Sequence, residues 1–175
     1  MKPKAKLLRN SKKAFTLVEL VVVIAVLAII AAIAIPAVIN IMNSATESRV
    51  ETDAASIDSA VKTFHSGIVN GTVHQGNLPT SVTSVAGATF PPDNASNGAR
   101  ASYANNIATV QQAMQYAGIW DRLQSSLTGG DFGYSEGSVV AAVDGNGTAL
   151  TQTANGAAIT QITAGTVTLG TVLAH

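Results

Sequence analysis

Residues 20–39 read LVVVIAVLAIIAAIAIPAVI, twenty consecutive positions without a charge or a polar side chain. At a rise of about 1.5 Å per residue, such a helix is about 30 Å long, the hydrocarbon thickness of a bilayer. A secretory signal peptide is the competing interpretation, because it also combines a basic start with an apolar stretch. It fits poorly, since its apolar region is only about 7 to 15 residues long and the residues PAVIN at 36–40 make a poor small-x-small cleavage site. The stretch therefore predicts a membrane-spanning helix.

The charges of the chain fall into two unlike parts. Six of the ten cations lie in the first 13 residues, where there is no acid; they are Lys2, Lys4, Lys6, Arg9, Lys12 and Lys13. From Phe15 onward four cations stand against ten acids, a net charge of −6. By the positive-inside rule the basic end stays in the cytoplasm, so everything after Asn40 is expected outside it. An acidic body repels phosphate, and no nucleic-acid partner is expected.

A carboxylate stands at the start of the apolar stretch, where residues 12–20 read KKAFTLVEL. Charged side chains carried into a bilayer are costly and usually serve a specific partner. The alternative is that Glu19 stays at the headgroup level and snorkels. The basic leader, this string and the apolar run together closely resemble the class III signal of type IV pilins and type II secretion pseudopilins.

The resemblance implies how the chain is processed. In that family a prepilin peptidase on the cytoplasmic side cuts just before the Phe and methylates the new N-terminus. Here the cut falls between Ala14 and Phe15, so that Phe15 becomes the methylated first residue. The family nearly always has Gly before the cut; because alanine is the next smallest side chain, we expect Ala14 to permit cleavage.

The resemblance also assigns three residues to assembly, namely Phe15, Glu19 and Pro36. Glu19 corresponds to the family's glutamate, and its charge is complementary to the α-amine of Phe15. Where water is scarce, two such charges attract strongly, so we expect pairing between neighbouring subunits. Pro36 falls where the family has a proline and is expected to kink or loosen the helix, although an ordinary membrane-helix kink is the alternative.

Beyond the apolar stretch the pattern predicts an α+β domain. Apolar side chains recur at spacings of three and four from Val50 to Ile68, which extends the helix to about Ile68, or about 54 residues and 80 Å. We expect a loop over 70–99, a second helix over about 100–117 with a further turn or two over 119–127, and antiparallel strands within about 138–173, at 138–143, 157–162 and 166–173. The resemblance implies the same plan, a long N-terminal helix packed on a small antiparallel C-terminal sheet.

These elements predict three segments. Residues 1–14 are a basic leader that is removed, 15–39 an apolar transmembrane and assembly helix, and 40–175 an exported globular domain.

Little in the exported domain points to chemistry. The chain has no cysteine, which excludes disulfides, thiol nucleophiles and iron–sulfur ligation. The three histidines, His65, His74 and His175, share no metal-ligand spacing and are expected to be solvated or locally hydrogen-bonded. No phosphate loop or nucleophile elbow is present. We therefore expect no enzyme activity, no catalytic residue, no metal and no cofactor.

One loop resembles the opening of a calcium site, since Asp144, Asn146 and Thr148 alternate. Related major pseudopilins hold a calcium in their C-terminal region. However, Asn155 stands at the twelfth position, where a calcium loop has an acid. A hairpin-like turn is therefore preferred to a calcium site.

Two classes of function remain. The leading hypothesis is a structural subunit of a type IV pilus or pseudopilus, inserted in the inner membrane by a single pass with its C-terminal domain outside the cytoplasm. Its partners would be membrane lipid, prepilin peptidase, an inner-membrane assembly platform and like subunits in a helical filament, in the periplasm or on the cell surface. The alternative is a membrane-anchored exported binding module, or a minor tip pilin that captures a ligand. Glu19 favours assembly, because a simple anchor has no use for a carboxylate there.

Overall fold

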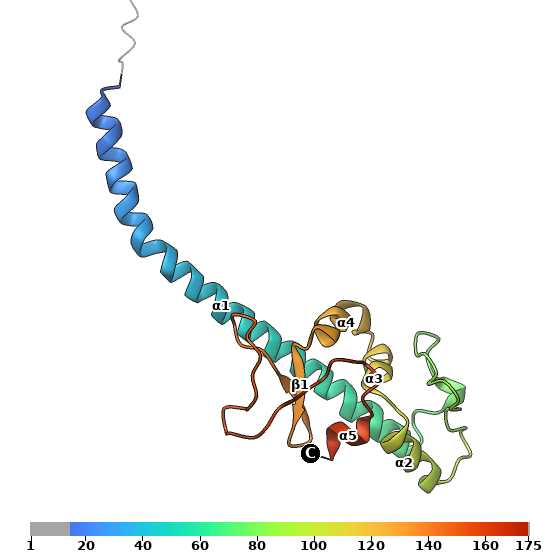
Figure 1. The fold of residues 1–175 in the computed structure, drawn as a ribbon. Coiled ribbons are helices and arrows are strands. Elements are labelled where there is room, and N and C mark those ends of the chain that lie inside the picture. Colours follow the sequence, from blue (N-terminus) through green and yellow to red (C-terminus); the bar gives the residue numbers. More distant parts are fainter. Residues whose placement is uncertain (1–14, 175) are drawn as a thin grey trace, which may run out of the picture. The chain divides into compact units, whose positions relative to one another are not determined.

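The computed structural model describes residues 15–174. The predicted leader, with Ala14, and His175 lie outside the described residues. The chain divides into two compact units, Met1–Ile41 and Met42–His175. Helix α1 (Leu17–Asn70) begins in the first unit and ends in the second (Figure 1), two residues beyond the predicted end.

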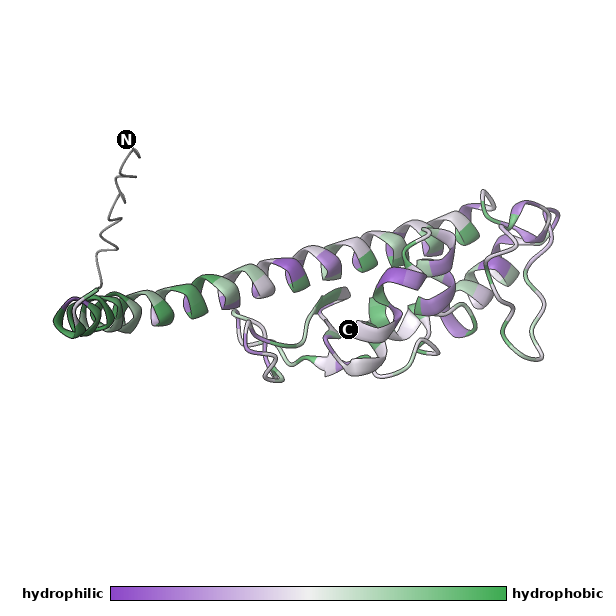
Figure 2. Cartoon of the chain, turned by 90° about the horizontal axis from the view of Figure 1, so that it is seen from above, coloured by the Kyte–Doolittle hydropathy of each residue, from purple (hydrophilic) through white to green (hydrophobic). Residues whose placement is uncertain are grey.

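The first unit consists, as far as it is described, of the apolar part of α1. Every residue from Phe15 to Ile41 is exposed, and Figure 2 shows this stretch as predominantly hydrophobic. By length and composition α1 is the one helix within residues 15–174 that could cross a membrane. The helix continues on both sides of Pro36, which has no N–H to donate to the carbonyl of Ala32. An apolar surface of this length needs lipid or other helices to cover it.

The second unit adds short elements to the polar half of α1. They are η1 (Gln75–Asn77), α2 (Asn97–Asn106), α3 (Val110–Tyr116), α4 (Trp120–Gly129), β1 (Phe132–Ser135), β2 (Ser138–Ala141), β3 (Thr160–Gln161) and α5 (Leu169–Leu173). The strands form an antiparallel sheet in the order β2-β1-β3. The α+β prediction of a long N-terminal helix with a small sheet is confirmed.

The core of this unit lies between α1 and the later elements (Figure 1). The inner face of α1 contributes Ile57, Val61, Phe64 and Ile68, all fully buried. The ring of Phe64 lies 5.2 Å from that of Tyr116 and 6.0 Å from that of Phe90. The helical spacing read from the sequence therefore identified the face of α1 that is buried.

The predicted helix over 100–117 is wrong as a single element. It is two helices, α2 and α3, separated at Ile107 to Thr109. Thr109 begins α3 as its N-cap: the N–H of Gln112 donates to its hydroxyl, and the Gln112 side chain accepts from the Thr109 N–H. This capping box starts a new helix and breaks the apolar periodicity across it. The expected turn over 119–127 is the helix α4.

The predicted strand over 166–173 is also wrong, because Leu169–Leu173 is the helix α5. Thr168 caps it by accepting from the N–H of Thr171. Leu169 and Val172 are both fully buried. Residues three apart share a helix face but point to opposite faces of a strand, so a helical turn buries both.

The other strand predictions are confirmed in part. Ser138–Ala141 falls within the predicted 138–143, whereas only Thr160–Gln161 of the predicted 157–162 is a strand. Strand β1 was not predicted. All four of its residues are buried, so it lacks the alternation that marks a half-exposed strand, and Gly133 weakens the signal further.

Candidate functional site

The N-terminus of α1 is closed by a pair of side chains. The N–H of Glu19 donates to the hydroxyl oxygen of Thr16 at 3.2 Å. In return, the N–H and the hydroxyl of Thr16 both donate to Oε2 of Glu19, each at 2.9 Å. This is a capping box, which satisfies N–H groups that the helix itself leaves without a partner. It also places a negative charge at the positive end of the helix dipole.

Only one oxygen of this carboxylate takes part in the box. All the hydrogen bonds described for the Glu19 side chain end on Oε2, and a carboxylate has acceptor capacity on both oxygens. The cap therefore fixes the side chain and leaves Oε1 able to accept from a further donor.

The predicted assembly residues lie along this segment. Phe15 is 82% exposed and directly precedes the capping residue, and Glu19 stands in the first turn of α1. Pro36 lies 17 positions further, about 25 Å along a helix, so it is not part of the same cluster. Ala14, on the other side of the predicted cut, is outside the described residues.

Thr16 was not among the site residues predicted from the sequence. Its signal was present, since a Thr followed three positions later by Glu, ahead of an apolar run, is the pattern of a capping box. The string KKAFTLVEL therefore encodes the start of a helix in addition to the processing signal that the sequence predicts.

Comparison with known proteins bears on this same segment. Residues 9–35 match the family model of the prokaryotic N-terminal methylation motif, the class III signal peptide of type IV pilins and pseudopilins. No curated protein and no solved structure is significantly similar to the chain. The motif and the apolar helix together support a type IV pilin-like exported protein that is anchored in a membrane. They point to a structural protein rather than an enzyme.

The loop considered for calcium is a turn. Oδ1 of Asp144 accepts from the N–H groups of Asn146 and Thr148, both at 2.8 Å. The hydrogen bond from the Thr148 N–H is the main reason that the pKa of Asp144 lies below its ordinary value. This carboxylate therefore organises the backbone, and the prediction of a turn is confirmed.

No metal site emerges elsewhere in the described chain. Within residues 15–174, no group of three His, Asp or Glu side chains is placed to hold a metal ion. Nε2 of His65 lies 2.7 Å from the side-chain oxygen of Asn105. Nδ1 of His74 accepts from the N–H of Gly76, and its other nitrogen lies 3.6 Å from Asp93. These two histidines are locally bonded, as expected.

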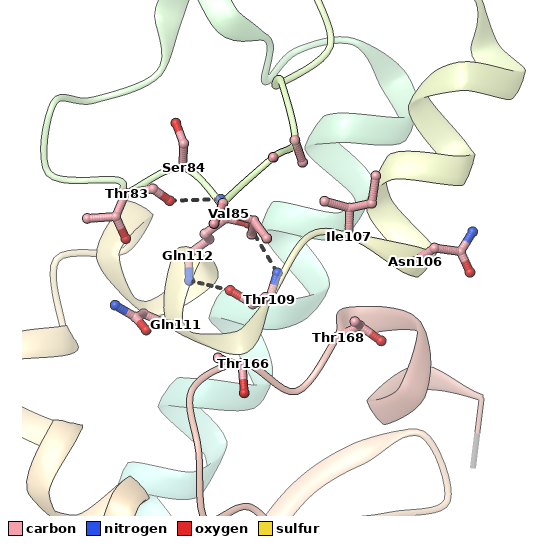
Figure 3. Close-up of a pocket in the computed structure, with 13 residues that line it drawn as sticks. Thr83, Ser84, Val85, Asn106, Ile107, Thr109, Gln111, Gln112, Thr166 and Thr168 are labelled. Atoms are coloured by element: carbon pink, nitrogen blue, oxygen red, sulfur yellow. Dashed lines mark hydrogen bonds between the residues drawn. The ribbon is translucent and has the colours of Figure 1, made fainter.

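A pocket of about 540 Å³ lies between the loop 83–88, the start of α3 and the segment before α5. Figure 3 shows hydroxyl and amide side chains around it, among them Thr83, Thr109 and Gln112. Gln112 is already used, since its amide nitrogen donates to the Thr83 carbonyl at 2.9 Å. No titratable side chain lines this pocket, so it offers hydrogen bonds but no acid or base.

Proposed function

We propose that this chain is a structural subunit of a type IV pilus or a type II secretion pseudopilus. Prepilin peptidase cuts it between Ala14 and Phe15 and methylates Phe15, and the mature chain polymerises through its N-terminal helix. The observation that carries the proposal is the methylation motif at 9–35, directly joined to an apolar helical stretch whose side chains are all exposed.

The physical chemistry of the cut end supports assembly. Cleavage removes six cations and creates an amine at Phe15 with a pKa near 8 in ordinary peptides, still protonated at neutral pH. An incoming subunit brings this amine into a bundle of apolar helices, where an unpaired charge is unfavourable. The capped Glu19 of a neighbouring subunit supplies the opposite charge through Oε1.

The first test is the chemistry of the N-terminus. Intact mass and N-terminal fragmentation of the membrane-extracted protein should give a chain that begins at Phe15 with an N-methyl group. Surface filaments sheared from the same cells should contain this mature chain. A mature start near Asn40 would identify an ordinary signal peptide and would contradict the proposal.

The second test separates the two roles of Glu19. Glu19→Gln retains an oxygen that can complete the capping box but removes the charge, whereas Thr16→Ala removes the cap and retains the charge. If pairing drives assembly, Glu19→Gln and Glu19→Ala both lose filaments sharply at equal membrane abundance. Thr16→Ala should assemble nearly as well as wild type once mass analysis has confirmed normal cleavage. Filaments from Glu19→Gln at wild-type yield would leave Glu19 a helix cap only.

A further inference from the structure

Two sides of α1 in the second unit remain uncovered after its inner face is buried. Successive residues of a helix are about 100° apart around its axis. Arg49 is two positions, or about 200°, from both Glu47 and Glu51, so it points to nearly the opposite side of the helix. We name the side with Glu47 and Glu51 the acidic flank, and the side with Arg49 the basic flank. All three residues are exposed.

The acidic flank borders an apolar groove of about 440 Å³ between α1, β2 and the segment 150–159. Its lining includes Val140, Leu150 and Ile159. Asp58 also lines the groove, but Lys62 neutralises it at 2.9 Å. Glu47 and Glu51 have no ion pair within the described chain, so the rim of the groove carries a charge of −2.

The basic flank has one carboxylate for two guanidinium groups. Arg122 of α4 donates to Oδ1 of Asp53 at 2.5 Å, and Nε of Arg49 lies 3.9 Å from Oδ2. The Arg49 side chain is 79% exposed. The neighbouring Asp121 borders a separate hollow with Ser81. The cluster of Arg49, Asp53 and Arg122 therefore carries a charge of +1.

Each flank also presents one exposed apolar side chain. After Met42, the exposed large hydrophobic residues of the described chain are Tyr116 and Leu150, each 36% exposed. Leu150 belongs to the groove of the acidic flank. Tyr116 lines a hollow of about 200 Å³ with Ser56 and Thr63, on the side of α1 that carries Arg49.

Two of the possible contacts between the flanks, one charged and one apolar, correspond to similar offsets along α1. Arg122 lies at the level of Asp53, six residues beyond Glu47, which is about 9 Å. Val139 lies at the level of Asp58, to which its N–H donates. Ala142 is three residues further along the chain, about 10 Å in an extended segment, and its carbonyl accepts the N–H of Leu150. This sets Leu150 near the level of Glu51.

Tyr116 borders α1 between Ser56 and Thr63, so it lies about 13 Å beyond the level of Leu150. Contact between Arg122 and Glu47 therefore requires an axial shift of about 9 Å between two copies, and contact between Tyr116 and Leu150 requires one of about 13 Å. With such a shift Arg49 lies about 6 to 10 Å from the level of the neighbouring Glu47 and approaches it with its long side chain.

We propose that the basic flank of one copy, with Tyr116, docks into the groove of the acidic flank of the next copy. Like flanks repel, so a two-fold contact is disfavoured. A contact between two different surfaces, repeated with an axial shift, generates an open filament rather than a closed dimer. This inference rests on the proposed function and assigns the contact between exported domains that accompanies the helix bundle.

The absence of cysteine in the chain makes cross-linking clean. Tyr116→Cys and Leu150→Cys subunits are co-expressed as full-length chains in cells that assemble filaments, and treated with a short bis-maleimide. We expect a dimer that contains one chain of each kind, and no dimer when either variant is present alone. Dimers of Tyr116→Cys alone or of Leu150→Cys alone, without the mixed dimer, would overturn the proposal.

Charge reversal supplies the second readout. Glu47→Lys with Glu51→Lys makes both flanks positive and should lower filament yield by about tenfold. Adding Arg49→Glu reverses the basic flank as well and should restore the yield to within about twofold of wild type. Glu136→Lys, an exposed acid that borders neither hollow, is the matched control and should assemble as wild type.

The outcomes distinguish the two proposals. If wild-type filaments form and Glu47→Lys with Glu51→Lys assembles equally well, the flank contact is refuted and the proposed function stands. If the reversed chain fails and Arg49→Glu does not rescue it, charge complementarity is refuted. If the wild-type chain enters no filament at all, both proposals fail together.

Discussion

A single carboxylate joins the sheet to the long helix, and its removal should cost more than a surface ion pair. Oδ1 of Asp58 accepts the N–H of Val139 at 2.9 Å. Val139 is 4% exposed and belongs to β2, an edge strand of the sheet. Oδ2 of Asp58 accepts from Lys62, which also donates to the hydroxyl of Ser138.

The two partners of Asp58 have different weights. A buried N–H left without an acceptor costs about 1 to 3 kcal/mol, whereas a half-exposed ion pair on a helix contributes about 0.5 kcal/mol or less. We therefore expect Asp58→Ala to destabilise the second unit by about 2 kcal/mol and Lys62→Ala by about 0.5 kcal/mol. Asp58→Asn retains an acceptor for Val139 and should fall between them.

Thermal and urea unfolding of the fragment 42–175, followed by circular dichroism, measures these differences. For a domain of this size, about 1 kcal/mol corresponds to about 4 °C in the melting temperature. Asp58→Ala should therefore melt about 8 °C below wild type and Lys62→Ala about 2 °C below. Equal losses in Asp58→Ala and Lys62→Ala would show that only the ion pair matters and would refute the bond to the edge strand.

Three further predictions concern the second unit. The fragment 42–175 should sediment as a monomer, because it lacks the apolar stretch that we propose as the main assembly contact. Filaments of this fragment alone would show that the main assembly contact lies outside the N-terminal helix. Gly170→Ala should destabilise the fragment by about 1 to 3 kcal/mol, because a Cβ there would collide with the backbone of Asn105, whereas Gly98→Ala, where the space is open, should be neutral or stabilising in the same melts. Folding lowers the pKa of Asp144. The ionised carboxylate therefore contributes its full stabilisation above its pKa in the unfolded chain, near 4, and this stabilisation is lost as the pH falls through its pKa in the folded chain. The melting temperature of wild type should accordingly drop more steeply below about pH 4 than that of Asp144→Asn.

The features that the sequence predicted well are those set by long, regular patterns. The apolar run and the spacing from Val50 to Ile68 continue over many turns, so α1 was located to within two residues at each end. The turn at Asp144 was predicted because its chemistry is local. The strand at β1 and the helix α5 were not, because tertiary contacts decide them.

The case of α5 shows the mechanism. Its residues favour a strand by composition, but Thr168 caps a helical turn and Gly170 permits close approach to Asn105. Neither effect is visible in a count of β-branched residues, since the cap depends on one hydroxyl and the approach on a partner 65 positions earlier in the chain.

The capping box changes how Glu19 is understood. The sequence leaves two roles open for Glu19, a residue at the headgroup level or an assembly residue. The structure adds a third role, helix capping, which is compatible with assembly. Capping holds the carboxylate through Oε2 alone, which reduces the side-chain freedom that would otherwise be lost when a neighbouring amine binds. Because Thr16 follows Phe15 directly, the residue that caps the helix is also the second residue of the predicted mature chain. Cleavage would therefore create the charged amine next to a helix start that is already formed, with a negative charge fixed in its first turn.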